Sequence, residues 1–271
     1  MASIIEKLNK NFITYVPPVF EAVFECTLGM ISENFEEFPE HRINFYNLLH
    51  QVIKHCFPAI IQLAPQQFKL VLDSIIWAIK HTMRNVADIG HQALYTMLEN
   101  FAANEEAMQP FYQTYCLDIL QHLFSVVTDP SLTAGLVQQT TVLAYIFSII
   151  ESGKIRVPLS PTQLQSGQTN VDFVKHYVKD LLKNVYSHLT EAQIDITVKG
   201  FFDLDQDISA FKDHLRDFLI QIREFSGEDD SDLFLAEREM LLKQHEEEKR
   251  RRQMMVPGII NPHDIPEDMQ D

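Results

Sequence analysis

Three aspartates at alternate positions, Asp203, Asp205 and Asp207, resemble the start of a calcium-binding loop. An EF-hand loop carries oxygen ligands at positions 1, 3 and 5, glycine at position 6 and glutamate at position 12. This chain has Ile208 at position 6 and His214 at position 12. We therefore expect a solvated turn and the first turn of a helix at these aspartates, without a calcium ion.

Zinc ligands and catalytic groups form a second class of candidate chemistry. His50, His55 and Cys56 lie close together in the sequence, but no second pair of ligands follows at zinc spacing. We interpret them as ordinary residues of a helix face. No phosphate-binding loop, dinucleotide fingerprint, nucleophile elbow or pair of catalytic carboxylates can be picked out. The sequence therefore predicts a protein that is not an enzyme and has no metal or cofactor.

The basic run Lys249, Arg250, Arg251 and Arg252 has two interpretations. Such runs can be nuclear import signals. The run also follows the glutamates at 246–248 at a spacing of four residues, an order of charges that stabilises a helix and suits its C-terminal end. We favour the second interpretation, a solvated helix end.

Composition limits the class of protein to which the chain can belong. With 271 residues, 46% of them hydrophobic, it can bury a substantial core without disulfides or metals. Its net charge of −16 argues against binding nucleic acid and favours basic protein partners. Cys26, Cys56 and Cys116 are far apart, as expected for reduced thiols in a cytosolic or nuclear protein. We expect no membrane span and no secretory signal, because no apolar run is long enough.

The elements that would position these residues are helices, and the stretch 65–101 defines their pattern. Its two halves carry apolar residues three and four positions apart, and the polar residues 80–85 separate the halves. The apolar residues are Phe68, Val71, Leu72, Ile75, Ile76 and Ile79, then Val86, Ile89, Ala93, Leu94, Met97, Leu98 and Phe101. This pattern predicts a helical hairpin, which needs further hairpins on either side to bury its apolar face.

The same pattern recurs along the chain. Pro17, Pro65 and Pro110, which we interpret as helix openings, are 48 and 45 residues apart. A period of roughly 40–47 residues is typical of HEAT and armadillo repeats. We therefore predict an all-α HEAT-repeat solenoid (an α-α superhelix) of about five hairpins, preceded by a short helical segment at 4–16. The expected helices cover about residues 17–28, 40–56, 65–79, 86–101, 105–127, 131–151, 171–185, 190–202 and 208–225.

Three local signals complete this prediction. Residues 153–170 are rich in Pro, Gly, Ser and Gln, which indicates an exposed loop. Thr190 and Gln193 have the spacing of a capping box at a helix N-terminus. Trp77 is expected in the core, at an interface between repeats.

The C-terminal part differs in composition from the repeats. A long helix is expected at 231–254, with a cluster of apolar residues only in its first half, and the acidic stretch 256–271 carries three prolines. We therefore expect three domains: the array at 1–227, the terminal helix at 228–255 and a flexible acidic tail at 256–271.

Long segments of the chain resemble a known family. They are VFECTLGMI (23–31), QFKLVLDSIIWAIKHTMRNVAD (67–88), FYQTYCLDILQHLFSVVTD (111–129), FKDHLRDFLIQIREFSGEDDSDLFL (211–235) and VPGIINPHDIPEDM (256–269). These segments resemble the C-terminal end of the exportin-one family of nuclear export receptors, in the karyopherin-β (importin-β) superfamily. The resemblance covers nearly the whole chain and is weakest before residue 17 and at 157–170. Gln270 departs from it, because a cysteine is expected there.

The resemblance implies a transport function. The family's members are HEAT-repeat rings that carry leucine-rich export signals out of the nucleus with the GTP-bound form of the GTPase Ran, pass nucleoporins and shuttle between nucleus and cytoplasm through the nuclear pore. It implies that this chain is the last part of such a receptor, without the export-signal groove and the N-terminal repeats that hold Ran. The alternative is a generic helical-repeat scaffold or adaptor with no transport role, which periodicity alone does not exclude.

The resemblance also implies that the last helix and the tail regulate cargo release. We expect the base of the helix to be anchored by an apolar cluster and the tail to make a weak, salt-sensitive contact with the rest of the ring. The residues assigned to these interactions are Leu233, Phe234, Leu235, Leu241, Leu242, Ile259, Ile260, Asp264, Glu267 and Asp268.

Overall fold

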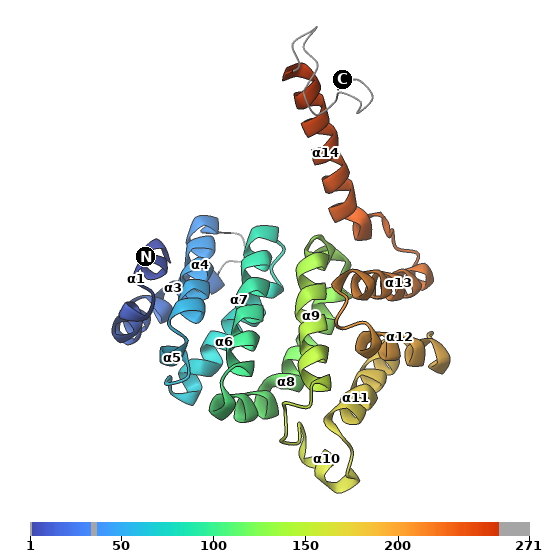
Figure 1. Ribbon diagram of the computed structural model, residues 1–271, viewed down its shortest axis with the longest axis horizontal. Coiled ribbons are helices and arrows are strands. Elements are labelled where there is room, and N and C mark those ends of the chain that lie inside the picture. The colour runs from blue at the N-terminus through green and yellow to red at the C-terminus, as the bar shows by residue number, and fades with distance from the viewer. Residues whose placement is uncertain (1, 34–36, 255–271) are drawn as a thin grey trace, which may run out of the picture. The chain divides into compact units, whose positions relative to one another are not determined.

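The computed structural model describes residues 2–33 and 37–254 (Figure 1). The chain divides into two compact units, Met1–Asp230 and Ser231–Asp271. All regular structure in the described residues is helical, so the predicted all-α repeat architecture is confirmed.

The first unit is a succession of antiparallel helices. Its longer helices are α3 (Glu25–Glu33), α4 (Pro39–His55), α6 (Pro65–Ile79), α7 (Arg84–Ala102), α8 (Glu105–Val127), α9 (Leu136–Glu151), α11 (Asn170–Val185), α12 (Glu191–Asp203) and α13 (Ile208–Ser226). Its shorter helices are α1 (Ala2–Leu8), η1 (Asn9–Tyr15), α2 (Val16–Val19), η2 (Phe20–Phe24), α5 (Phe57–Ile60), η3 (Pro130–Gly135) and α10 (Pro161–Ser166).

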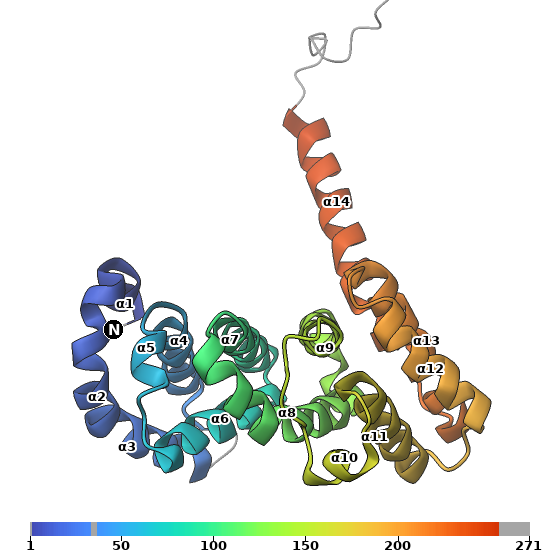
Figure 2. The same cartoon turned by 60° about the horizontal axis from the view of Figure 1, so that its bottom comes forward.

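The helices pair into hairpins, and the hairpins stack in chain order. Helix α6 packs against α7, α8 against α9 and α11 against α12. Between hairpins, α4 contacts α1 and α7, and α7 contacts α9 (Figures 1 and 2). Helix α13 packs against both α12 and α9. Each hairpin thus buries its apolar face against its neighbours, as a repeat array must.

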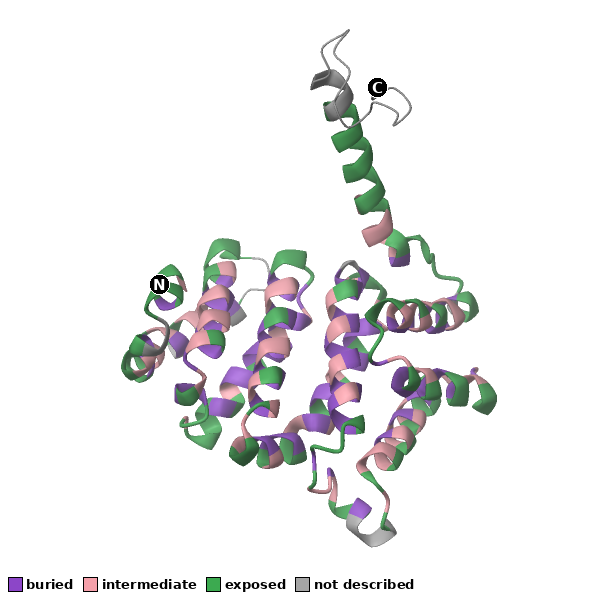
Figure 3. Cartoon of the chain, in the orientation of Figure 1, coloured by how far each residue is buried: buried purple, intermediate pink, exposed green. Residues whose placement is uncertain are grey.

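Aromatic rings fill the spaces between hairpins. The rings of Phe101 (α7) and Phe111 (α8) stack with their centres 3.8 Å apart, and Phe68 (α6) meets both edge-on. Further along, Phe147 (α9) and Phe201 (α12) stack at 5.5 Å. Figure 3 shows the buried residues running along these packed faces. Each of these rings buries a large apolar area, so aromatic side chains contribute much of the free energy that stabilises the core.

Close backbone approach also fixes the packing of α6 on α7. A Cβ at Gly90 would lie 2.8 Å from the Cβ of Ala78 and 3.0 Å from the backbone nitrogen of Ile79. Only a residue without a side chain lets the two helices come this close.

Two of the predicted local signals are confirmed. Thr190 and Gln193 form the capping box at the start of α12, where the Thr190 hydroxyl accepts a hydrogen bond from the Gln193 amide. Trp77 of α6 stacks on Tyr46 of the preceding hairpin, with ring centres 6.1 Å apart, so it lies at an interface between repeats. Its side chain is half-buried, so the expected position in the core is only partly correct.

The proline spacing was only partly a correct guide. Pro65 is the first residue of α6, but Pro110 lies inside α8, which begins five residues earlier at Glu105. The side chain of Asn104 accepts a hydrogen bond from the amide of Ala107 and caps α8. The cap therefore sets the start of this helix, and the proline is accommodated within its second turn.

The expectation of an exposed loop at 153–170 was also partly wrong. The segment contains the short helix α10, and its apolar residues Ile155 and Leu159 are buried. Side-chain amides bind its backbone, as described below, and they supply the hydrogen bonds that a strand or helix would otherwise provide.

The second unit comprises η4 (Ser231–Phe234) and α14 (Leu235–Met254), the long helix expected from the sequence. From Met240 to Arg250 every side chain of α14 is exposed. The arginine Arg238 donates a hydrogen bond to the carbonyl of Ser231 and ties the two helices together.

Candidate interaction surfaces

The five residues predicted to anchor the base of the terminal helix differ in how far they are buried. Leu233 is buried and Leu235 is half-buried, whereas Phe234 is 37% exposed. Leu241 and Leu242 are each 64% exposed, so the structure does not bring them into a packed cluster with Leu233. That these four leucines and one phenylalanine form an interaction site remains a prediction.

The other residues assigned to the tail lie outside the described part of the chain. These are Ile259, Ile260, Asp264, Glu267 and Asp268. Of the basic run, Lys249 and Arg250 lie exposed on α14, as the glutamates at 246–248 do.

A buried arginine holds the end of the first unit. Arg223, on the last turns of α13, donates one hydrogen bond to the carbonyl of Asp229 (3.0 Å) and another to the hydroxyl of Thr133 (2.7 Å). Gly227 ends α13 in the left-handed conformation, with φ of 71°. Together these contacts fix the chain between α13 and residue 230 and attach it to η3, two hairpins back in the sequence.

A second buried arginine lies between the first two hairpins. Arg42 of α4 donates hydrogen bonds to the carbonyls of Glu37 and, at 2.8 Å, Ile31. Its guanidinium lies 5.8 Å from the centre of the Trp77 ring. The neighbouring Tyr46 is buried, which raises the pKa of its phenol. This cluster holds the α3–α4 connection, and its buried phenol offers no acid or base near neutral pH.

Polar contacts also join the second helices of successive hairpins. The ring nitrogen Nε2 of His50 (α4) lies 3.2 Å from the hydroxyl of Thr96 (α7), and the amide of Asn100 donates to the carbonyl of Ile53. Burial, and then the charge of Lys54, lower the pKa of His50 below its usual value. His50 is therefore a neutral packing residue, consistent with its interpretation as part of a helix face.

The three aspartates of the calcium-like pattern have three separate roles. Asp203 ends α12, and Asp207 caps α13 by accepting hydrogen bonds from the amides of Ser209 and Ala210. Asp205 is buried, and its pKa is raised by burial and by the nearby charge of Glu151. Within residues 2–33 and 37–254, no three His, Cys, Asp or Glu side chains gather as metal ligands would.

Side-chain amides bind the extended segment between α9 and α10. Gln109 of α8 donates to the carbonyl of Lys154 (2.9 Å) and accepts from the amides of Arg156 (2.9 Å) and Val157 (3.3 Å). One turn further on, Gln113 donates to the carbonyl of Pro158 at 3.1 Å. We call these two glutamines the α8 latch.

Asn170 binds the same segment from the other side. Its amide donates to the carbonyls of Ile155 (2.8 Å) and Val157 (3.1 Å). Lys154 and Arg156 are consequently fixed at exposed positions on either side of the buried Ile155.

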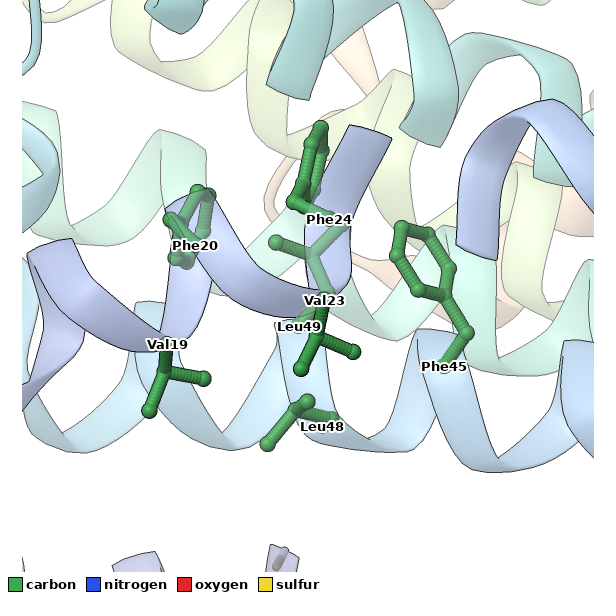
Figure 4. A pocket seen from close by; sticks show the side chains of 7 residues that line it. All are labelled: Val19, Phe20, Val23, Phe24, Phe45, Leu48 and Leu49. Atoms are coloured by element: carbon green, nitrogen blue, oxygen red, sulfur yellow. The ribbon is translucent and has the colours of Figure 1, made fainter. Parts of the chain in front are cut away.

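The described part of the first unit carries at least two surface hollows. One, of about 250 Å³, lies between η2 and α4 and is apolar (Figure 4). The other, of about 980 Å³, lies between the α7–α8 turn and the latched segment. Its walls are formed by Ala102, Ala103, Glu105, Met108, Gln109, Lys154, Arg156 and Val157. The first is lined only by apolar side chains, whereas the lining of the second includes charged and amide side chains.

Sequence reasoning missed the two buried arginines and the α8 latch. Both arginines lie in register with an apolar stripe, Arg42 with Tyr46 and Arg223 with Leu219, and that signal could have identified them. The latch glutamines lie on an exposed helix face, and nothing in their spacing indicates a partner 45 residues away.

Comparison with known proteins adds information on ancestry. The family model described as "CRM1 C terminal" matches residues 1–227. Exportin-1 of Drosophila melanogaster is 53% identical over the whole chain, Protein EXPORTIN 1B of Arabidopsis thaliana is 42% identical over the whole chain, and Exportin-1 of Schizosaccharomyces pombe is 38% identical over 98% of it. The chain spans 25% of the length of each of these relatives.

Among the described helices, none combines the length and apolar character that crossing a membrane requires.

Proposed function

The chain belongs to the CRM1 C-terminal family, and from that premise we propose that it acts as the C-terminal part of a nuclear export receptor. One observation carries the proposal: similarity to relatives named exportin extends over the entire chain, at 53% identity in one case. Such a receptor is a carrier and not an enzyme. It works in the nucleus, at the nuclear pore and in the cytoplasm.

In this proposal the helical array is a structural part of the receptor, and other repeats of the receptor bind the cargo. Its partners are GTP-bound Ran, nucleoporins and, through repeats outside the quarter that this chain matches, cargo with leucine-rich export signals. Direct binding to nucleic acid is not part of the proposal, because the net charge of −16 opposes contact with phosphates. The chain alone is then expected to bind export-signal peptides weakly.

A pull-down tests this division of labour. The chain is presented to GTP-loaded Ran with and without an export-signal peptide, alone and joined to the remaining three quarters of Drosophila melanogaster Exportin-1. We expect peptide-dependent capture of Ran only by the joined protein. Capture of neither ligand by a joined protein that is folded would favour a scaffold without a transport role. Micromolar peptide binding by the chain alone would contradict the assignment of the groove to the other repeats.

We propose further that the terminal helix and tail act as a switch. The tail holds four acids and no base, and its apolar pair Ile259 and Ile260 gives it one adhesive point. A contact of a few kcal/mol through such a segment is displaced when cargo and Ran bind, whereas a permanent contact could not act as a switch.

The switch predicts the effect of deleting residues 256–271 from the joined receptor. Affinity for an export-signal peptide, measured by fluorescence anisotropy without Ran, is expected to rise at low salt, and the gain is expected to shrink at high salt. Neutralising Asp264, Glu267 and Asp268 should reproduce the salt-sensitive part of the gain. Neutralising three exposed glutamates of α14 (246–248) is the matched control. Unchanged affinity at low salt would identify the tail as a passive end.

A further inference from the structure

The hollow beside the α8 latch carries two positive charges without partners. The side chains of Lys154 and Arg156 are exposed and make no hydrogen bond or ion pair with any other described residue. Elsewhere in the first unit, exposed bases such as Lys69 and Lys199 pair with an aspartate four residues away. Because the whole chain has 38 acids and 22 bases, two cations side by side at one hollow differ in sign from its overall charge.

The geometry of the segment orders these two charges. Lys154 and Arg156 are exposed while Ile155 between them is 4% exposed, the alternation of an extended chain whose side chains point to opposite sides. Side chains two residues apart in an extended chain lie about 6.6 Å apart. The latch hydrogen bonds hold the backbone at Lys154, Arg156 and Val157, so the points from which the two charged side chains extend are set before any partner binds.

Much of the backbone of the segment is already hydrogen-bonded to side chains. The carbonyls of Lys154 and Ile155 and the amides of Arg156 and Val157 all bind side-chain amides of Gln109 or Asn170. A partner therefore cannot add to the segment as a β-strand. Recognition must use the charged side chains and the floor of the hollow, to which the nearly buried Met108 contributes.

We propose that this hollow binds an extended acidic peptide segment of a partner protein, with two carboxylates spaced two residues apart. The carboxylates pair with Lys154 and Arg156, since the spacing of alternate side chains is the same in both chains. Glu105 also lines the hollow and repels a third acid, which limits the number of carboxylates that the peptide can place there.

Two fluorescein-labelled peptides test the proposal on the full chain. Both carry two aspartates in a background of alanine and glycine. In one the aspartates are two residues apart, and in the other they are five residues apart. We expect the first to bind more tightly, with an affinity that falls as salt rises. Lys154→Ala and Arg156→Ala should each weaken it about two- to fivefold. The double variant K154E/R156E should abolish binding, and Glu105→Gln should strengthen it.

The matched control is K69E/K199E, which makes the same change of charge at exposed bases that already have partners. Its affinity for the peptide should stay within twofold of the unchanged chain, and the circular dichroism of both double variants should match it. Equal binding of the two peptides, or equal loss in the control, would overturn the proposal. Salt-sensitive binding of a poly(U) probe in preference to the peptide would also overturn it, by assigning the charges to nucleic acid.

Discussion

The guanidinium of Arg42 lies 5.8 Å from the centre of the Trp77 ring, although Arg42 is wholly buried. A positive charge thus sits at the contact between the first two hairpins, stabilised by the face of an aromatic ring and by the carbonyls of Ile31 and Glu37. Arg42 joins the α3–α4 connection to the next hairpin.

Replacing Arg42 by methionine should destabilise the protein by about 2–4 kcal/mol, because it removes the cation and leaves the carbonyl of Ile31 without its donor. Urea unfolding measures the effect. The control is Arg84→Met, whose ion pair with Asp88 lies on the surface and should cost at most about 0.5 kcal/mol. Similar costs at the two sites would show that the buried contact adds nothing.

Glycine substitutions should separate packing from helix propensity. Gly90→Ala places a Cβ against the backbone of α6, which cannot move aside without separating the two helices, and should cost about 1–3 kcal/mol. Gly29→Ala in α3 meets nothing within 4 Å and should be neutral or stabilising by up to about 1 kcal/mol. Thermal unfolding of both variants checks the pair, and a loss of stability in Gly29→Ala would contradict this reading of α3.

His91 should make the first unit sensitive to mild acid. Burial lowers the pKa of its ring from 6.5 to about 4, and Nδ1 lies 2.7 Å from the carbonyl of Ala87. As pH falls below 6.5, His91 therefore becomes protonated in the unfolded chain, while in the folded chain it stays neutral until the pH approaches 4. Stability from this group is fully present above pH 6.5 and is lost as pH falls towards 4, by about 3 kcal/mol in all.

His91→Leu should flatten the dependence of unfolding free energy on pH between 6.5 and 4. His176→Leu is the control, because His176 has the same local contact, Nδ1 to the carbonyl of Asp172, but lies exposed on α11. Urea titrations at several pH values measure both variants. An equally steep loss of stability in His91→Leu would assign the acid sensitivity to other groups.

The contact of Arg223 with Thr133 should control local opening at the end of the first unit. Thr133→Val removes the hydroxyl, which also donates to the carbonyl of Pro130, but keeps the shape of the side chain. Arg223→Met removes the hydrogen bonds to Thr133 and to the carbonyl of Asp229. Hydrogen exchange of the amides at 227–230 should speed up in each variant. If the contact is direct, the double variant T133V/R223M should exchange no faster than Arg223→Met. Additive effects would mean that the two residues act separately.

The repeat architecture could be predicted from the sequence because apolar periodicity decides which face of a helix is buried. Helix starts at Pro65 and near Glu105 were predicted and are confirmed, but the proline spacing does not explain the second. The proline at Pro65 marks one, but the start of α8 is set by the cap Asn104, and Pro110 lies within the helix. A helix cap needs only one polar side chain, and the same residue types are common in loops. A single asparagine is therefore a weaker sequence signal for a helix start than a proline.

The candidate surfaces were harder to predict than the fold. The α8 latch joins residues 45–48 positions apart, and local spacing contains no trace of such a contact. The terminal helix was expected at its observed position, but Leu241 and Leu242 extend from it into solvent. Two apolar residues in a helix of mostly polar and charged side chains suggest that another surface covers them. The sequence of the helix does not identify that surface.

The hydrogen bond from Arg223 to Thr133 has a mechanical consequence. In an array whose hairpins touch only their neighbours, tension applied at the C-terminal end would peel the helices off one by one. Here α13 contacts α9 as well as α12, and its last turn is tied to η3, 90 residues back. A pull at residue 230 is therefore borne by α9 and η3 as well as by α12 and α13. The end of the first unit should yield as one block, at a higher force than a single helix would bear.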